Sequence, residues 1–402
     1  MLFNITLQNK NDTKIWKYDT KDNSLTDENN EKIENLTLFN SKENKNKEKK
    51  LAIQLGFSCN MSCSYCLQSK TKKTKFNQLE CDTLIEKLLK LDLTNTRLEF
   101  WGGEPLLYFK EIVYIVRKLK SKKHLPSSFL IITNGLLLTV RMVKFLLKMN
   151  FNLAISHDAQ SQDIRGKNPF EIPSSLEAIK YLYELHKNGE HRFSINSVIT
   201  KDNISTENRF KYFAKYLGEN ENGDIILPHG GEGPVYNSDI DLLNIETLNN
   251  DVYTDVVFGA GMYYGYYYDA VGSFINNLGK RSISNITTKC GIDNESKYSI
   301  IDIHGKDLSC HNYDFKFKIN TLQENDICLK CPVVQLCKSS CPAIDKSSDL
   351  FKKNCTVMFN TNMGLLRAII EIITVLRNPY VRDNEEEIYR VTNIQQSISS
   401  TI

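Results

Sequence analysis

Three cysteines in one short run are the residues best suited to chemistry in this sequence. They are Cys59, Cys63 and Cys66, in a C-x3-C-x2-C spacing directly after an apolar segment of strand length. A structural zinc site takes four protein ligands, whereas a [4Fe–4S] cluster held by three thiolates keeps one iron open for a ligand that is not protein. Cys81 is the alternative fourth ligand, but we interpret it as a small buried residue on a helix.

A second and denser group of seven cysteines lies in the C-terminal third of the chain. Its spacing is C-x14-G-x4-C, then C-x2-C-x5-C-x3-C, then one further cysteine. The members are Cys290, Cys310, Cys328, Cys331, Cys337, Cys341 and Cys355. A pair of zinc knuckles is the alternative, but seven ligands do not divide into two four-cysteine sites. Prolines follow two of these cysteines, as in bacterial ferredoxins, so the pattern favours iron–sulfur clusters.

The composition favours reduced thiols over disulfides. The chain has 402 residues, 11 cysteines, 41% hydrophobic residues and a net charge of +3. The N-terminus lacks a basic segment followed by an apolar one, so we predict a cytoplasmic protein. In the reducing cytoplasm, clustered cysteines are best interpreted as metal ligands before disulfides are considered. The nearly balanced charge predicts no nucleic-acid partner. No apolar run approaches about 18 residues, so no membrane partner is predicted.

Alternating strands and helices must position these ligands. From residue 51 onward, apolar runs of strand length alternate with segments of helical period, which indicates a parallel sheet covered by helices. The predicted strands are 51–57, 97–101, 129–133, 152–156, 193–200 and 224–227, and the predicted helices between them are 79–91, 108–120, 140–149, 176–187 and 206–217. Six such units are too few for a full eight-fold barrel and fit a partial barrel or an open sheet.

The pattern divides the chain into five segments. They are a strand-rich N-terminal appendage (1–49), a partial barrel (50–235), a connecting helical segment (236–289), a cysteine-rich domain (290–358) and a C-terminal helix with a tail (359–402). The cysteine-rich domain has few long apolar runs, so bound metal would have to organise it. Tyrosines clustered at 263–268 are interpreted as packing residues, and the last 20 residues as a loose tail.

Together these motifs resemble the radical S-adenosylmethionine (radical SAM) superfamily. The cysteine run follows the first strand, and Trp101-Gly102-Gly103-Glu104-Pro105 follows the second, like the Gly-Gly-Glu motif of the family. The resemblance implies an α/β fold with a partial (β/α)6 TIM-like barrel. It also implies SAM bound at a [4Fe–4S] cluster on the first three cysteines, and one-electron cleavage of SAM to a 5′-deoxyadenosyl radical.

The resemblance also implies a set of cofactor-binding residues. Glycines allow close backbone approach, and the glutamate of the motif would meet the methionine amino group. Ser156-His-Asp158-Ala159 resembles the Ser-Leu-Asp-Gly segment of the family, with alanine in place of glycine, and Arg165 could pair with the methionine carboxylate. The predicted SAM-binding residues are Tyr65, Gly102, Gly103, Glu104, Thr133, Asn134, Ser156, Asp158, Arg165 and Asn196.

The C-terminal cysteines resemble the SPASM extension of radical SAM enzymes that modify peptides. With it the resemblance covers roughly residues 51–358 and implies two auxiliary [4Fe–4S] clusters, hence three in all. By the family's pattern one auxiliary cluster takes Cys328, Cys331, Cys337 and Cys355. The other takes Cys290, Cys310 and Cys341 and lacks a fourth cysteine. Ten cysteines are then ligands, and Cys81 is left over.

The function implied is that of a peptide maturase. The radical would abstract a side-chain hydrogen of a ribosomal precursor peptide, made of leader and core, and an intramolecular crosslink would form. The compact chain and short N-terminal segment favour a carbon–carbon, cyclophane-type crosslink, and residues 1–49 could bind the leader by strand addition. An electron donor such as flavodoxin or ferredoxin is a further expected partner. The candidate proton acceptors are Asp302, Asp307, His311 and Asp314.

Three alternatives stay open at the level of the sequence. They are a thioether-forming enzyme, a sulfatase-maturating enzyme and a non-catalytic iron–sulfur electron carrier. His311 stands where sulfatase-maturating relatives usually have aspartate, which argues against that activity. Release of 5′-deoxyadenosine from SAM would distinguish an enzyme from a carrier.

Overall fold

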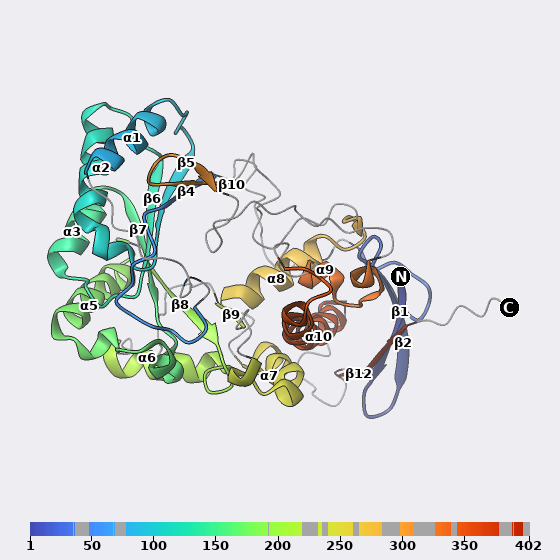
Figure 1. The fold of residues 1–402 in the computed structure, drawn as a ribbon. Helices are drawn as coiled ribbons and strands as arrows, with labels where there is room; N and C mark the ends of the chain where they lie inside the picture. Colours follow the sequence, from blue (N-terminus) through green and yellow to red (C-terminus); the bar gives the residue numbers. More distant parts are fainter. Residues whose placement is uncertain are drawn as a thin grey trace.

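The computed structural model has a curved sheet covered by helices at one end and a helical bundle with a small sheet at the other (Figure 1). The structure describes residues 1–34, 36, 48–66, 68, 78–191, 193–218, 232–234, 240–259, 265–283, 298–308, 326–338, 344–377, 388 and 390–396. The two ends correspond to two hydrophobic cores, one between the large sheet and its helices and one in the bundle.

The large sheet has the predicted partial-barrel topology. Its strand order is β11-β10-β4-β5-β6-β7-β8-β9, and all neighbours are parallel except the β10–β11 hairpin. The strands are β4 (Lys49–Gln54), β5 (Thr96–Trp101), β6 (Ser128–Thr133), β7 (Phe151–Ser156), β8 (Phe193–Ile199), β9 (Glu232–Pro234), β10 (Tyr298–Asp302) and β11 (Asp307–Leu308). The sixth strand predicted at 224–227 lies outside the described residues.

Helices cover the outer face of this sheet, as predicted (Figure 1). They are α1 (Gln78–Leu89), α2 (Phe109–Ser121), α3 (Val140–Lys148), α4 (Gln162–Arg165), α5 (Pro173–Lys187) and α6 (Thr206–Leu217), with 3₁₀ turns η1 (Pro105–Tyr108), η2 (Ala159–Ser161) and η3 (Pro169–Glu171). Side chains such as Thr139 and Ser205 cap α3 and α6 by accepting backbone N–H bonds, which fixes where these helices begin.

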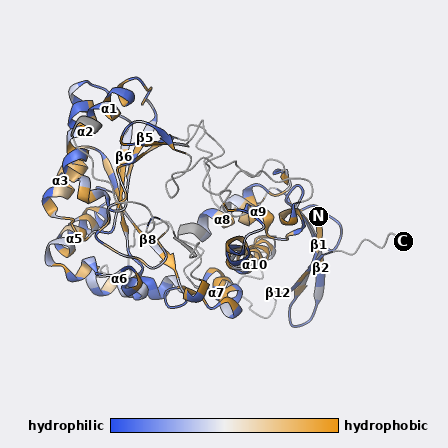
Figure 2. Cartoon of the chain, in the orientation of Figure 1, coloured by the Kyte–Doolittle hydropathy of each residue, from blue (hydrophilic) through white to orange (hydrophobic). Residues whose placement is uncertain are grey.

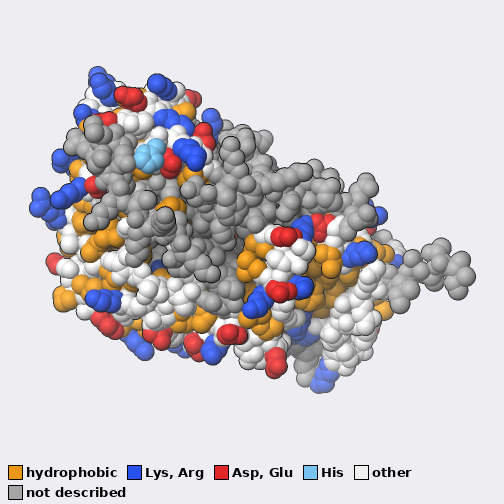
Figure 3. Space-filling view, in the orientation of Figure 1, with side chains coloured by type: hydrophobic (Ala, Val, Ile, Leu, Met, Phe, Trp, Pro, Cys, Tyr) orange, Lys and Arg blue, Asp and Glu red, His pale blue; other side chains and the backbone are white. Residues whose placement is uncertain are grey.

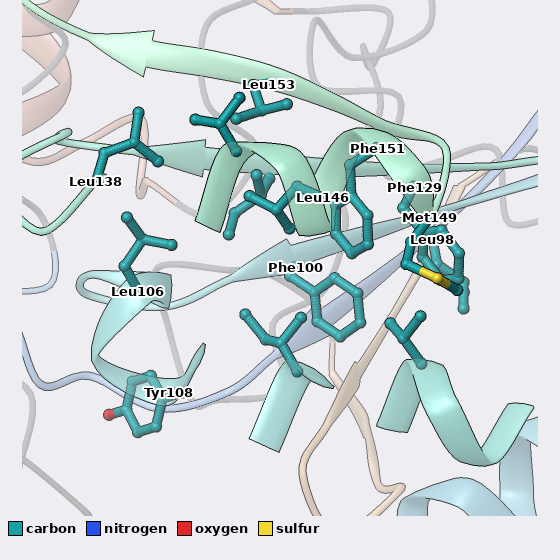
Figure 4. Packing of buried hydrophobic residues seen from close by; sticks show 14 of the residues in the cluster. Leu98, Phe100, Leu106, Tyr108, Phe129, Leu138, Leu146, Met149, Phe151 and Leu153 are labelled. Atoms are coloured by element: carbon teal, nitrogen blue, oxygen red, sulfur yellow. The ribbon is translucent and has the colours of Figure 1, made fainter. Parts of the chain in front are cut away.

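The outward side chains of the strands form the barrel core. Phe100, Phe129 and Phe151 stack across β5, β6 and β7, with ring centroids of Phe129 and Phe151 4.7 Å apart (Figure 4). Cys81 is fully buried in this core on α1, as the sequence predicted. Because successive strand residues alternate between faces, the other set of side chains points into the barrel. The hydropathy view shows apolar residues concentrated along these strands (Figure 2).

The cysteine-rich segment contributes directly to the barrel. β10 pairs in parallel with β4, so that Asp302 lies opposite Gln54, and β11 folds back on β10. Lys87 on α1 anchors the hairpin through bonds to the Gly305 carbonyl and to Asp307, 2.9 Å from its carboxylate. The strand formed by residues 298–302 therefore belongs to the barrel, although helices α7 and α8 of the bundle separate it from the other barrel strands in the chain.

A four-stranded antiparallel sheet joins the two ends of the chain. Its order is β12-β1-β2-β3, and the strands are β1 (Leu2–Gln8), β2 (Thr13–Asp19), β3 (Ser24–Thr26) and β12 (Arg390–Gln396). The N-terminal strands agree with the predicted appendage. The expectation of a loose C-terminal tail is wrong for residues 390–396, because they pair with β1 from Phe3 to Gln8.

The helical bundle packs against one face of this small sheet. Its elements are α7 (Ile245–Val257), α8 (Gly265–Asn276), α9 (Val334–Cys337) and α10 (Asp349–Arg377), with 3₁₀ turns η4 (Ile240–Leu242) and η7 (Ile327–Lys330). Tyr267 is buried in its core, as predicted for the tyrosine cluster. Among the described helices, α10 alone is long and apolar enough to cross a membrane, and 56% of its most apolar stretch is buried inside the protein.

A buried carboxylate ties the bundle to the small sheet. Glu371 on α10 accepts bonds from the Tyr253 hydroxyl at 2.7 Å, the Val391 N–H at 2.7 Å and Arg390 at 3.1 Å. It is 2% exposed. Removing such an acceptor leaves buried donors unsatisfied, so this contact holds β12 to the bundle.

Candidate functional site

The cysteine loop after β4 is held to the loop after β5 by backbone hydrogen bonds. The Gly103 N–H donates to the Gly56 carbonyl at 2.9 Å, and the Glu104 N–H donates to the Ser58 carbonyl at 2.9 Å. The Tyr108 hydroxyl accepts from the Ser58 N–H at 3.1 Å. The chain just before Cys59 therefore has a defined path along the carboxyl ends of β4 and β5.

Gly103 is required by this close approach. A Cβ at this position would lie 2.4 Å from the Ser58 carbonyl oxygen and 2.7 Å from that of Phe57, which no side chain can do without moving the backbone. At Gly102 the nearest atom, the Gly56 carbonyl oxygen, would be 3.0 Å away. The second glycine of the motif thus sets the distance between the two loops.

Glu104 is a buried connector between the ends of β5 and β6. Its carboxylate accepts bonds from the Leu106 N–H at 2.9 Å, the Thr133 hydroxyl at 2.6 Å and the Asn134 N–H at 2.8 Å. The side chain is 1% exposed, and burial raises its pKa. Asn134 in turn donates to the Asn60 side chain at 2.7 Å. The predicted pair Thr133 and Asn134 is therefore joined to the Gly-Gly-Glu loop and to the cysteine loop.

Three further predicted residues meet across the mouth of the barrel. The Tyr65 hydroxyl donates to the Asp158 carboxylate, and Arg165 donates to the Tyr65 oxygen at 2.7 Å and lies 3.5 Å from Asp158. The Val198 N–H also donates to Asp158 at 2.9 Å. Burial raises the pKa of Asp158 and the charge of Arg165 opposes that rise. This cluster fixes the loop between Cys63 and Cys66 against β7 and β8.

Ser156, the last residue of β7, and Asn196, in the middle of β8, are register partners. Both are half-buried and share the inner face of the sheet. Next to them, His157 is fully buried against the rings of Phe170 and Phe213. Burial lowers the pKa of His157 to about 3, and its Nδ1 accepts the Ala159 N–H at 2.9 Å. His157 is therefore a neutral packing residue.

Ala159 has a backbone conformation that favours glycine. Its φ is +51°, in the left-handed region, which costs an L residue roughly 1–2 kcal/mol. Its methyl group is buried in the barrel core, at 1% exposure. The turn after β7 therefore has a strained alanine at the position where the family pattern has glycine.

The three cysteines of this loop are the predicted cluster ligands, and that role stays a prediction. Each is a free thiol and is half-buried. Burial raises the pKa of Cys59 and of Cys63, and the guanidinium of Arg165 opposes this at both. Within the described part of the chain, no three His, Cys, Asp or Glu side chains are close enough to hold a single metal ion.

The barrel mouth also contains buried polar atoms that have no partner in the described structure. These are Nε of Arg165 and Oε1 of Gln54. Unsatisfied buried polar atoms are uncommon in proteins and mark places where a ligand or water completes the bonding. Their position beside the cysteine loop fits a site that binds a polar cofactor.

Four cysteines of the second group are described, three on the segment 326–338 and one on α10. Asp326 caps the turn at Cys328 by accepting its N–H at 2.9 Å, and Cys331 and Cys337 follow on the same short segment. Burial raises the pKa of Cys328 to about 12, with a smaller contribution from nearby Cys337. Cys355 on α10 is close enough to affect Cys331 electrostatically. The predicted ligands Cys290, Cys310 and Cys341 lie outside the described residues.

The predicted proton acceptors remain predictions. Asp302 accepts the N–H groups of His304 and Lys306 at 2.9 and 2.8 Å and so shapes the β10–β11 turn. The Asp307 side chain is 83% exposed and pairs with Lys87. His311 and Asp314 lie outside the described residues.

Several residues of the site could not be recognised from motifs. They include Asn60, Tyr108, Gln162 and Asn203; the last two bond to the backbone of Asp158 at 3.1 and 2.8 Å. Gln54 is another. A polar residue at the carboxyl end of an otherwise apolar strand was the available signal for Gln54, because functional side chains gather there in barrels.

Comparisons with known proteins agree with this geometry. Residues 53–212 match the family model of the Radical SAM superfamily. The radical SAM cyclopropyl synthase TigE of Paramaledivibacter caminithermalis is 26% identical over 73% of this chain and 68% of its own length. The mycofactocin maturase MftC of Mycolicibacterium smegmatis is 24% identical over 46% of each chain, so this chain spans less than half of that relative.

The fold has solved counterparts as well. The structure of anSMEcpe with bound AdoMet and the Cp18Cys peptide superposes with a TM-score of 0.57 at 18% identity, covering 81% of this chain and 98% of that one. Residues 53–212 are therefore a radical SAM domain, as the cysteine motif predicted. The family match thus assigns a radical SAM domain to this part of the chain and supports an enzyme, and the proteins that the chain resembles include a maturase and a cyclopropyl synthase.

Proposed function

We propose that this enzyme is a peptide maturase that removes a hydrogen atom from a side chain of a ribosomal precursor peptide and forms an intramolecular crosslink. The observation that carries the proposal is the bonding of the Cys59–Cys66 loop to Asn134 after β6 and to Asp158 after β7, which are themselves bonded to Glu104 after β5 and to Val198 on β8. The names of two relatives, a maturase and a cyclopropyl synthase, support it.

In this proposal Cys59, Cys63 and Cys66 hold a [4Fe–4S] cluster and the surrounding residues hold SAM. When bound, these groups supply a 5′-deoxyadenosyl radical for hydrogen abstraction. The chain's own residues bind these groups and orient them. Asp158 and Arg165 form a fixed pair of opposite charge, and Arg165 Nε remains available to an acceptor on a ligand. Glu104 keeps the two loops at a constant spacing.

The same proposal assigns two auxiliary [4Fe–4S] clusters to the C-terminal cysteines. Cys328, Cys331, Cys337 and Cys355 are a complete set of four, and the placement of three of them on one short segment supports this grouping. Cys290, Cys310 and Cys341 would hold the other cluster. A flavodoxin- or ferredoxin-type donor in a reducing cytoplasm would supply electrons, consistent with the free thiols among the described cysteines.

A carbon–carbon crosslink is the favoured product. A cyclopropyl group is closed by carbon–carbon bond formation, so the name of the relative TigE favours this over a thioether or formylglycine product. A cyclophane-type crosslink requires an aromatic residue in the peptide that is joined to a nearby residue.

Co-expression with short peptides encoded beside the gene tests the proposal. The modified peptide should be lighter by two hydrogen atoms. Tandem mass spectrometry should locate a crosslink between two residues that does not involve a cysteine sulfur. The Cys59→Ala variant is the matched control and should leave the peptide unchanged. A wild-type enzyme with its full complement of iron that modifies no such peptide would contradict the proposal.

A further inference from the structure

Gln54 is the last residue of β4 and faces the interior of the barrel. Leu51 and Ile53 pack in the core beneath the helices, so the alternating side chain of Gln54 points to the opposite face. Its register partners are Trp101 on β5 and Asp302 on β10. The residue is 3% exposed.

One end of the Gln54 amide is satisfied and the other is not. Nε2 donates to the Gly56 carbonyl at 3.0 Å. Oε1 is buried and has no hydrogen-bond partner among the described residues. A buried acceptor without a donor is costly to keep, since it loses its bonds to water and gains none in return.

The orientation of the amide follows from its surroundings. The Gly56 carbonyl already accepts the Gly103 N–H at 2.9 Å and can only accept from Gln54. Reversing the amide would place two oxygens against each other, so Oε1 must be the atom left over. The unpartnered group is therefore an acceptor, and the group that completes it must be a donor.

Nearby donors on the inner face are committed elsewhere. Trp101 Nε1 donates to Glu99 at 3.2 Å, and Arg97 donates twice to the same carboxylate, at 2.7 and 3.0 Å. The Gly103 and Glu104 N–H groups bond to the cysteine loop. A donor for Gln54 is thus expected to come from a molecule that enters the barrel.

We infer that Gln54 is a ligand-binding residue whose Oε1 accepts a hydrogen bond from an N–H group of a molecule bound at the mouth of the barrel. Two ligands present that chemistry, the ammonium group of SAM and a backbone amide of the peptide substrate. The inference rests on the proposed function, because it takes both molecules to bind there. No motif of the sequence pointed to this residue.

Two apolar variants test the inference, Gln54→Met and Gln54→Leu. Each variant removes the Oε1 acceptor and the hydrogen bond from Nε2 to Gly56. Because the two side chains differ in branching, they test the packing separately, and a result from one variant that folds is enough to test the inference. The dissociation constant of SAM is measured by equilibrium dialysis on anaerobic, iron-loaded protein, which requires no turnover. KM and kcat are then measured with the peptide. Iron content and the thermal unfolding midpoint report on folding.

A loss of affinity of about 10- to 100-fold is expected for one ligand, with iron content and unfolding midpoint close to wild type. A weaker SAM affinity identifies the ammonium as the donor. An unchanged SAM affinity with a raised KM for the peptide identifies a peptide amide.

The control is Tyr183→Phe, which removes a hydroxyl that donates to the Gly218 carbonyl at 3.2 Å, near the C-terminal ends of α5 and α6 and away from the barrel mouth. It should lower stability slightly and leave both affinities unchanged. If Gln54→Met or Gln54→Leu folds and binds both ligands like wild type, or if neither folds, the inference is wrong and the amide is structural. A wild type that binds SAM but modifies no peptide would instead contradict the proposed function.

Discussion

The two cysteine-bearing regions are positioned by different means. The cysteine loop of the barrel belongs to one run of eight residues and is fixed by bonds to strand ends and loops of the same sheet. The described cysteines of the bundle depend on residues that are far apart in the chain. Gln335, between Cys331 and Cys337, bonds to Arg281 at 2.7 Å and to the Thr20 carbonyl at 2.7 Å.

This difference has a consequence for folding. The barrel loop can form once β4 to β8 are in place, because all its partners come from that sheet. The bundle cysteines need the N-terminal sheet, α8 and α10 to be assembled first. The space-filling view places the described bundle residues on a side of the molecule separate from the barrel surface (Figure 3). We therefore expect damage to one region to leave much of the other intact.

The largest expected effect is the loss of one whole cluster. If the chain holds three [4Fe–4S] clusters as proposed, it binds about 12 iron atoms, and Cys59→Ala and Cys328→Ala should each retain about 8. Cys59→Ala should keep the unfolding midpoint, whereas Cys328→Ala should lower it, because metal organises the bundle segment. Iron analysis and calorimetry on anaerobic protein measure this. Equal effects of both variants on the midpoint would remove the distinction between the regions.

The second effect concerns the spacing of the loops in the barrel. Gly103→Ala forces a Cβ into the Ser58 carbonyl and should slow SAM cleavage by about 100-fold or more, since catalysis depends on sub-ångström positioning. Gly102→Ala is the graded control and should be milder because its closest contact is 3.0 Å. Rates of 5′-deoxyadenosine release under saturating SAM distinguish the two. A Gly103→Ala enzyme as fast as Gly102→Ala would show that the close approach is unimportant.

The third effect concerns the long-range contacts of the bundle. Glu371→Gln weakens the bonds from Tyr253, Arg390 and Val391 and should cost about 2–3 kcal/mol in the free energy of unfolding. Urea titration measures this, and hydrogen exchange should show loss of protection in β12 with β5 to β7 unaffected. Glu246→Gln, on the exposed side of α7, should change stability by less than about 0.5 kcal/mol. Equal costs would contradict the role of Glu371.

The smallest effect is a pH dependence confined to the barrel. His157 has a pKa near 3 when folded and about 6.5 when unfolded. The unfolded chain then binds more protons between these values, so stability falls as the pH is lowered below about 6.5, by up to about 1.4 kcal/mol per pH unit. His157→Gln should show a flatter pH profile, and its deficit against wild type should shrink from pH 7 to pH 5. Parallel profiles would mean that His157 is not buried and neutral.

The sequence predicted the barrel well because its information is local. Apolar strands and amphipathic helices alternate over short distances, and the Gly-Gly-Glu segment and cysteine run are continuous in the chain. The pairing of β12 with β1, and of β10 with β4, joins segments more than 200 residues apart, and no local pattern encodes such a partner. Gln54 was missed for a related reason, since its significance lies in a single unpartnered oxygen that only a packed structure reveals.

The central claim is that the Cys59–Cys66 loop makes this barrel a site of reductive SAM cleavage, and one measurement tests it most directly. Anaerobic wild-type protein with reconstituted clusters is incubated with SAM and dithionite, and 5′-deoxyadenosine is quantified by chromatography beside Cys59→Ala. The account predicts steady release by wild type and none by the variant, which should still hold about 8 iron atoms. Release by the variant at the wild-type rate, or no release by fully loaded wild type, would contradict it.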